Sequence, residues 1–285
     1  MQKIVITAVL ACILGVSQPD VSFGQVAKNI TNAGYKLVWA DEFNKNGTPD
    51  TTNWKFENGF QRNHELQWYQ AENANCKNGL LVIEVKKTNI KNPNYIAGST
   101  NWKTNREFIT YTSSSLNTEH KRSWKYGRFE MRARIPVDAG LWPAFWTLGI
   151  DKPWPSNGEI DIMEYYDHKI LANIACGTAR PYKAKWYSKT VPLDSLGANW
   201  SKQFHTWRMD WDENAIALYV DDRLLNKVEL KDLVNQDGSN FNPFMQPHYV
   251  LLNMALGGDN GGEPTSATQF PAKYEIDYVR VYQKK

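Results

Sequence analysis

The sequence has few of the residues from which common catalytic and metal sites are built. Only three of its 285 residues are cysteines, and its five histidines have neither metal-ligand spacing nor the arrangement of a Ser-His-Asp or Cys-His site. The net charge is +3, too small to indicate a nucleic-acid or anionic-membrane partner. Repeats and low-complexity linkers are also missing. A single ordinary domain without nucleic-acid partners is therefore expected.

Long apolar runs are missing as well. The stretch "IVITAVLACILGV" has 13 residues, whereas a membrane-spanning helix needs about 20. It follows Lys3 and precedes the polar "SQPDVSFG", which is typical of a signal peptide. We predict cleavage after Gly24, so that residues 1–24 are the signal peptide and residues 25–285 form one exported domain, either periplasmic, secreted or at the cell surface. A lipidated Cys12 is the alternative reading.

Two cysteines, Cys76 and Cys176, remain after this cleavage. In an exported protein they could form one disulfide, but spacing alone does not show whether they are neighbours. Two free, buried thiols are the favoured interpretation.

Aromatic residues are abundant, with 12 Trp and 14 Tyr, and suit either a sheet core or a carbohydrate cleft. In "RFEMRARI", apolar and polar residues alternate with a period of two, which predicts a strand with one buried face. Similar segments recur about every ten residues, so we predict an all-β fold of two packed antiparallel sheets. Only "LKDLVNQ", near residue 230, is predicted to be a short helix.

The segment "GEIDIMEY", residues 158–165, places three acids in an otherwise apolar strand. Burying unpaired acids costs several kcal/mol, which indicates a functional use. Glu159 and Asp161 share a face, and a β-bulge near Met163 would bring Glu164 to the same face. A solvated acidic strand or a calcium site would fit the spacing equally well.

Strand geometry gives a distance for these acids. With the bulge, the Cα atoms of Glu159 and Glu164 are roughly 13 Å apart, and leaning side chains reduce the carboxyl gap to about 5 Å. That gap is typical of a retaining glycosidase, whereas an inverting enzyme needs about 6.5–9.5 Å. Asp161, between them, could orient Glu159 and help keep Glu164 protonated.

Together with "GLWPAFWTLG", this segment resembles glycoside hydrolase family 16, whose catalytic strand reads Glu-x-Asp-x-x-Glu. Further matches are "LVWADEFN", "NHELQWYQAENANCKNGLLVIEVKK", "KYGRFEMRARIP", "FHTWRMDW", "LLNMALGG" and "YEIDYVRVYQ". The resemblance implies a concanavalin A-like jelly roll with a concave cleft that cuts internal β-linkages with retention. It also implies that Glu159 is the nucleophile, Asp161 the assisting acid and Glu164 the general acid/base.

The resemblance implies no cofactor for catalysis. It does imply a structural calcium on the convex side, with Glu42 and Asp277 in the matching segments, although Asp277 could equally be an outward-facing strand residue.

Substrate residues are also implied by the resemblance. "NHELQWY" and "LNMALGG" look like the laminarinase-type β-1,3-glucanase branch, in which Trp142 and Trp146 would shape subsites and stack on sugars. Asn63 and Glu65 would hydrogen-bond sugar hydroxyls, unless Glu65 instead orients a neighbour. Trp68 is expected in the core. Of the histidines, only His64 is expected near the cleft, together with the surface loop "ALGGDNGGEP".

Three features depart from that branch. Ser115, in "TSSSL", replaces a cleft arginine, and Arg180, in "TAR", replaces a histidine. The polar insert "NPNYIAGSTNWKTNREF" supplies Tyr95 and Trp102 for an extra subsite or a narrower cleft. If Arg180 entered the cleft, its guanidinium would suit an anionic or sulfated sugar.

The leading hypothesis is a monomeric, retaining endo-β-1,3-glucanase that also tolerates mixed β-1,3/1,4-glucan. The alternative is an endo-galactanase of the same family, of the agarase, porphyranase or carrageenase type. A non-catalytic β-glucan-binding protein is disfavoured because all three acids are present, and a transglycosylase would use the same chemistry with another acceptor.

Overall fold

The computed structural model describes residues 34–285. The predicted signal peptide, its cleavage point at Gly24 and Cys12 lie outside the described residues. Within the described part of the chain, no helix is long and apolar enough to cross a membrane.

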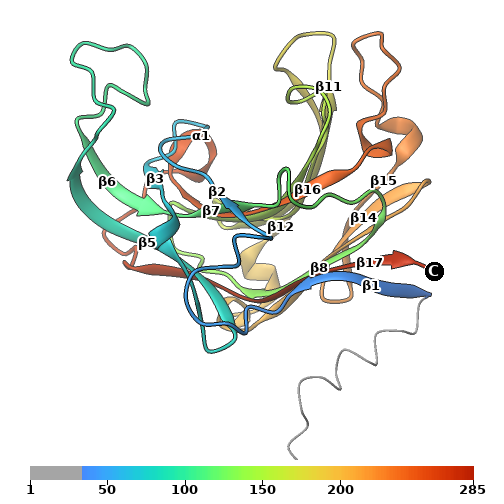
Figure 1. Ribbon diagram of the computed structural model, residues 1–285, viewed down its shortest axis with the longest axis horizontal. Helices are drawn as coiled ribbons and strands as arrows, with labels where there is room; N and C mark the ends of the chain where they lie inside the picture. The colour runs from blue at the N-terminus through green and yellow to red at the C-terminus, as the bar shows by residue number, and fades with distance from the viewer. Residues whose placement is uncertain (1–33) are drawn as a thin grey trace, which may run out of the picture. The chain divides into compact units, whose positions relative to one another are not determined.

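The fold consists of two large sheets packed face to face, as Figure 1 shows. Within residues 34–285, all strand pairings but one are antiparallel, the exception being the short edge pair of β3 and β6, so the predicted all-β jelly-roll sandwich is confirmed. The concave sheet has the order β12 (Ala184–Pro192), β11 (Lys169–Gly177), β10 (Glu159–Tyr166), β9 (Leu141–Gly149), β16 (His248–Leu256), β7 (Ser115–Asn117) and β2 (Lys55–Phe56).

The second sheet has ten strands. Its order is β15 (Arg223–Glu229), β14 (Ala215–Val220), β13 (His205–Trp211), β8 (Gly127–Arg134), β17 (Ala272–Lys284), β5 (Leu80–Lys91), β6 (Phe108–Ser113) and β3 (Gln67–Tyr69), with β1 (Tyr35–Asp41) on β17 and β4 (Ala74–Lys77) on β5. The one α-helix in the described chain is a single turn, α1 (Gly258–Gly261).

Alternation along the strands explains why the sheets pack. In β8, Phe129 and Met131 are fully buried in the core between the sheets, while Arg128 points outward and pairs with Asp210 at 2.7 Å. Burial of such apolar faces is the main stabilising term in folding. The polar side of the same strand remains hydrated and paired.

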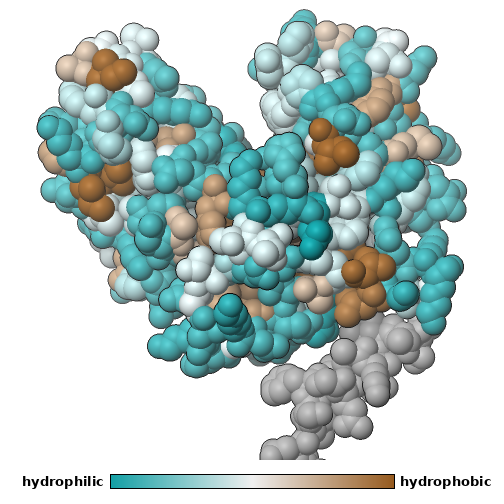
Figure 2. All heavy atoms as spheres, viewed as in Figure 1, coloured by the Kyte–Doolittle hydropathy of each residue, from teal (hydrophilic) through white to brown (hydrophobic). Residues whose placement is uncertain are grey.

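Two walls rise beside the concave sheet. One is the arm made by β5, β6 and their connection, and the other is the end of the sheet at β11 and β12; Figure 2 shows the hollow between them. The inserted segment between β5 and β6 is part of this arm, but neither Tyr95 nor Trp102 lines the cleft, and Trp102 packs against Phe60, so its predicted role in a subsite stays a prediction.

Two local predictions have definite outcomes. The predicted helix near residue 230 is wrong: only Leu230–Asp232 form a 3-10 turn, because the chain bends directly after β15. Cys76 and Cys176 are both free and buried, so the favoured interpretation of two thiols is confirmed.

His248 lies inside the concave sheet. It is fully buried, with Nδ1 at 3.1 Å from the Thr147 hydroxyl and Nε2 at 2.9 Å from the Pro243 carbonyl oxygen. Burial lowers the pKa of His248 from 6.5 to about 4. The imidazole therefore stays neutral in the folded protein at pH values where an exposed histidine is charged.

This burial predicts an acid-dependent loss of stability. Because the pKa of His248 is lower when folded, its contribution is complete above pH 6.5 and is lost as the pH falls towards about 4. The loss can reach about 3 kcal/mol in the free energy of unfolding. Chemical denaturation at pH 7.5 and pH 4.5 should show a smaller pH effect in His248→Gln than in the wild type. The exposed His120→Gln should behave like the wild type, and an equal pH effect in all three proteins would contradict the assignment.

Candidate active site

The predicted β-bulge is present in β10. Pairing with β9 shifts register between Asp161 and Met163, and pairing with β11 shifts between Asp161 and Glu164. As a result, Ile162 and Met163 are consecutive residues that both pack in the core. The extra inward residue returns Glu164 to the face that carries Glu159 and Asp161.

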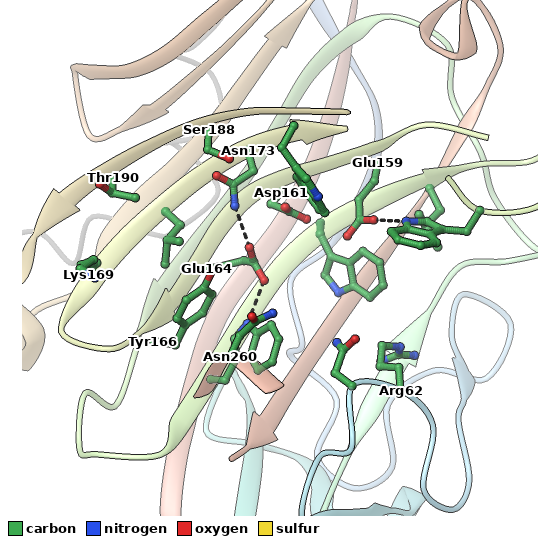
Figure 3. A pocket seen from close by; sticks show the side chains of 17 residues that line it. Arg62, Glu159, Asp161, Glu164, Tyr166, Lys169, Asn173, Ser188, Thr190 and Asn260 are labelled. Carbon is green, nitrogen blue, oxygen red and sulfur yellow. Dashed lines mark hydrogen bonds between the residues drawn. The ribbon is translucent and has the colours of Figure 1, made fainter. Parts of the chain in front are cut away.

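The three carboxyl groups form one cluster, and Figure 3 shows Asp161 between the two glutamates. Asp161 is 2% exposed, and the adjacent Glu164 and Glu159 both act on its pKa. The structure thus brings the three predicted catalytic acids together.

Specific donors hold each glutamate. Trp142 Nε1 donates to Glu164 Oε1 at 2.8 Å, and Asn173 Nδ2 donates to Glu164 Oε2 at 3.0 Å. Trp154 Nε1 donates to Glu159 Oε2. These donors fix the direction of both side chains, and Figure 3 draws the contacts as dashed lines.

The electrostatics distinguish the three acids. Burial and, to a smaller extent, the Glu159 charge raise the pKa of Glu164 to about 7, against the lowering hydrogen bonds from Trp142, Asp161 and Asn173. Burial, followed by the Glu164 and Glu159 charges, raises the pKa of Asp161 well above its usual range. Burial also raises the pKa of Glu159, but the Trp154 and Asp161 hydrogen bonds and the Arg62 charge lower it. Among the three acids, the surroundings of Glu159 thus favour the ionised form most, and those of Asp161 favour the protonated form most.

The cluster opens into a cleft of about 870 Å³. Its lining combines polar side chains with indole rings, the composition expected around a sugar chain. The lining residues are Arg62, Asn63, Trp142, Trp146, Leu148, Trp154, Glu159, Asp161, Glu164, Tyr166, Lys169, Leu171, Asn173, Trp186, Ser188, Thr190 and Asn260.

Trp142 and Trp146 line the cleft as expected, but they are poor stacking surfaces. Their exposed fractions are 6% and 8%. The Arg62 guanidinium lies 5.3 Å from the centre of the Trp146 ring and covers it, and Trp146 Nε1 donates to Asn253 Oδ1 at 2.7 Å. Trp142 therefore acts on the cleft through its indole N–H, which bonds Glu164, and Trp146 through its volume. Trp68 packs against Phe60 away from the cleft, as expected.

Asn63 lines the cleft, whereas Glu65 does not. Glu65 is 2% exposed and accepts hydrogen bonds from Gln67 at 2.6 Å and from Asn63 and Tyr69 at 3.2 Å. The prediction that Glu65 contacts sugar is corrected: the residue orients Asn63, which is the alternative that the sequence left open. His64 is exposed beside this segment and pairs with Asp259.

Arg180 is not among the residues that line the cleft. It is exposed in the turn between β11 and β12, where its main chain bonds Thr178 and Lys183. The cleft arginine is Arg62 instead. Its guanidinium donates to Glu57, which also accepts from the Ser115 hydroxyl at 2.5 Å. An arginine from the loop before β3 thus lies beside the serine of "TSSSL".

Glu42 and Asp277 do not fit the implied calcium site. Arg280 binds the Glu42 carboxylate through two bonds of 2.7 and 2.8 Å, and Arg132 donates to Asp277 at 2.6 Å. Each acid is already neutralised by a different arginine. Among residues 34–285, no group of three or more His, Cys, Asp or Glu side chains could hold a metal ion.

Sequence reasoning missed Trp154, Trp186 and Asn173. Trp154 and Trp186 are 38% and 45% exposed, so they are the cleft tryptophans with open ring faces. Trp154 precedes Pro155 just ahead of the catalytic strand, a proximity that could have identified it. Trp186 shares a face of β12 with Ser188 and Thr190, but period-two alternation does not show which face borders the cleft.

The concave sheet, the open cleft and the buried carboxyl cluster define a glycoside hydrolase. The model of the family described as Glycosyl hydrolases family 16 matches residues 60–280, and the chain belongs to this family.

Several known proteins are similar. The chain is 34% identical to a Beta-glucanase of Rhodothermus marinus, over 87% of this chain and 85% of the relative. It is 33% identical to Glucan endo-1,3-beta-glucosidase A1 of Niallia circulans, over 94% of this chain but 40% of that protein. It is 27% identical to a Keratan-sulfate endo-1,4-beta-galactosidase of Sphingobacterium multivorum, over 93% of this chain and 60% of the relative.

Two solved structures are similar to this chain in both fold and sequence. A structure described with endo-acting O-glycanases, which human gut bacteria express to initiate mucin breakdown, has a TM-score of 0.80 and 35% identity over 89% of this chain and 92% of its own. The laminarinase catalytic domain of Thermotoga maritima has a TM-score of 0.73 and 33% identity, over 88% of this chain and 99% of its own.

The Trp142 contact predicts a change in pH dependence. Its N–H favours the Glu164 carboxylate, so Trp142→Phe should raise the pKa of Glu164 further above about 7. The alkaline limb of the kcat/KM profile should therefore move to higher pH. Trp146→Phe is the matched control, because its indole donates to Asn253. An unmoved limb in Trp142→Phe, or an equal shift in both variants, would contradict the contact's role.

Proposed function

We propose that the protein is an exported, retaining endo-glycosidase that hydrolyses internal β-1,3-glucosidic bonds, and mixed β-1,3/1,4-glucan as well. The observation that carries the proposal is the division of protonation across the carboxyl cluster: Glu159 is supported as a carboxylate, and the pKa of Glu164 is about 7. Acid-assisted cleavage of a glycosidic bond needs one ionised and one protonated carboxyl at neutral pH, and the retaining course is proposed from the resemblance of the catalytic strand to that of the family. The similarity to a Beta-glucanase and a laminarinase supports the glucan substrate.

In the first step, a carboxylate oxygen of Glu159 forms a bond to the anomeric carbon, while the bond from that carbon to the glycosidic oxygen breaks. Glu164 gives its proton to the departing oxygen. In the second step, the Glu164 carboxylate takes a proton from water, and the water oxygen replaces Glu159 on the anomeric carbon. Asp161 keeps its proton and donates a hydrogen bond that stabilises the Glu159 carboxylate.

The cleft suits an internal cut of a polymer. It is open along the concave sheet, and its lining extends from Asn63 and Asn260 to Trp186 on β12. The exposed faces of Trp154, which bonds Glu159, and of Trp186, on β12, are available to sugar rings.

A second candidate is an endo-glycanase that acts on galactose-containing chains. It is favoured by the TM-score of 0.80 to a structure described with O-glycanases and by the similarity to a keratan-sulfate galactosidase. Glycosidic cleavage would proceed on the same acids, so the candidates differ in subsites. A sulfate-specific reading gains no support from Arg180, which is outside the cleft, or from Arg62, which is paired with Glu57.

A reducing-end assay on laminarin, barley mixed-linkage glucan, agarose, porphyran, carrageenan, keratan sulfate and mucin tests the substrate. Laminarin and barley glucan should yield short oligosaccharides, because the chain shares the β-glucanase pattern. Nuclear magnetic resonance should show the β-anomer of the new reducing end first. Activity on keratan sulfate or mucin alone would establish the second candidate, and an α-anomer formed first would contradict retention.

Replacing the nucleophile should separate binding from turnover. Glu159→Gln should lower kcat by at least about a thousandfold and leave the melting temperature and oligosaccharide binding nearly unchanged, because only the attacking oxygen is lost. Glu213→Gln, on an exposed turn, is the control and should keep full activity. Turnover by Glu159→Gln close to that of the wild type would contradict the nucleophile's identity.

A further inference from the structure

The loop before β3 enters the cleft through a strained turn. Asn63 and His64 are consecutive and have φ angles of 53° and 51°. Residues other than glycine rarely adopt this left-handed region, and two in succession persist only when the surroundings hold them. Asn63 lines the cleft and Arg62 precedes it, so the cleft's polar lining depends on this turn.

Arg106, from the insert between β5 and β6, holds one side of the turn. Its Nη1 donates to the Glu65 carbonyl oxygen at 2.6 Å, and its Nη2 donates to the His64 carbonyl oxygen at 2.9 Å. The guanidinium lies 4.8 Å from the ring centre of Phe60 and 5.2 Å from that of Trp102. One planar cation thus joins two carbonyls of the turn and is enclosed by aromatic rings from the loop and from the insert.

The loop that contains α1 holds the other side. The Asp259 N–H donates to the Asn63 carbonyl oxygen at 2.8 Å, and His64 Nδ1 lies 3.0 Å from the Asp259 carboxylate. A side chain at Gly258 would place its Cβ 2.4 Å from the Asn63 oxygen, so glycine is required for this approach. The turn is therefore enclosed between the insert and the α1 loop.

Two residues of this loop, Arg62 and Asn63, line the cleft. The Arg62 guanidinium covers Trp146 and pairs with Glu57, and its charge lowers the pKa of Glu159. Asn63 Nδ2 is oriented by Glu65, whose main-chain carbonyl is bound by Arg106. A displacement of the turn would move Arg62 and Asn63 together.

We propose that Arg106 is a positioning residue for the substrate cleft, which holds the Asn63–His64 turn so that Arg62 and Asn63 keep their places in the cleft lining. The inference rests on the proposed glycosidase function for its kinetic consequence, whereas its structural consequence stands without any substrate. Arg106 itself does not line the cleft, so its effect passes through the turn.

Hydrogen exchange tests the structural consequence. In Arg106→Leu, amides of residues 60–66 should exchange at least about tenfold faster than in the wild type, while those of β10 should keep their protection. Arg223→Leu, an exposed arginine on β15, is the matched control and should change neither region. Unchanged exchange of residues 60–66 in Arg106→Leu would overturn the proposal, and so would an equal increase throughout the chain.

Kinetics test the functional consequence on whichever polysaccharide the wild type cleaves. Arg106→Leu should raise KM about tenfold with a smaller fall in kcat, and Arg106→Lys, which keeps the charge but not the paired donors, should recover part of the loss. A merely structural role would lower kcat through loss of folded enzyme and leave KM unchanged, and that result would overturn the proposal. In an Asn63→Ala background, the Arg106→Leu effect should shrink, because both act on one turn.

The two hypotheses fail differently. If the wild type cleaves no polysaccharide in the panel, the proposed function fails, while the exchange measurement still decides whether Arg106 holds the turn. If the wild type is active and neither KM nor the exchange rates respond to Arg106→Leu, the positioning role fails and the proposed function stands.

Discussion

The burial of three carboxyl groups on one bulged strand is the constraint on which the rest of the cleft depends. Desolvation raises the pKa of Glu159, Asp161 and Glu164 alike, because burial removes the water that would stabilise each charged carboxylate. Which acid keeps a proton is then decided by its neighbours. Trp154, Asp161 and Arg62 favour the charged form of Glu159. At Glu164, the Glu159 charge favours the protonated form, against the hydrogen bonds from Trp142, Asp161 and Asn173.

The surrounding sheet serves this arrangement. Neighbouring strands supply the indole of Trp142 and the amide of Asn173, and the bulge directs Glu164 towards both. The core side of the same strand is apolar, so the bulge is held by packing of Ile162 and Met163. The sheet therefore sets the geometry of the acids, and the loops around the cleft supply its electrostatic surroundings.

Patterns of neighbouring residues in the sequence predicted the features that depend on strand geometry alone. Period-two alternation predicted the sandwich, and the parity of the acids in "GEIDIMEY" predicted the bulge at Met163. Features that depend on distant contacts were not predictable in this way. The sequence does not show that Ser115 lies beside the Glu57–Arg62 pair, because it is 58 residues away from Glu57 in the chain.

The same limit explains the corrected residues. The guanidinium of Arg180 could bind an anionic sugar, but the turn after β11 holds this residue outside the cleft. Glu42 and Asp277 have the carboxylate oxygens that calcium prefers, yet these carboxylates are hydrogen-bonded by Arg280 and Arg132, respectively. Residue type predicts what a group can do, and its partners in the fold determine whether it does so.

The central claim is that Glu159 forms the covalent bond and Glu164 exchanges the proton. Its most direct test is to trap the intermediate with a 2-deoxy-2-fluoro glycoside that carries a good leaving group, because the fluorine slows both formation and hydrolysis of the glycosyl-enzyme, whereas the leaving group speeds formation only. Peptide mass spectrometry of the trapped protein should place one glycosyl group on Glu159. A glycosyl group on Glu164 or Asp161 would contradict the account. So would loss of activity with no labelled carboxylate.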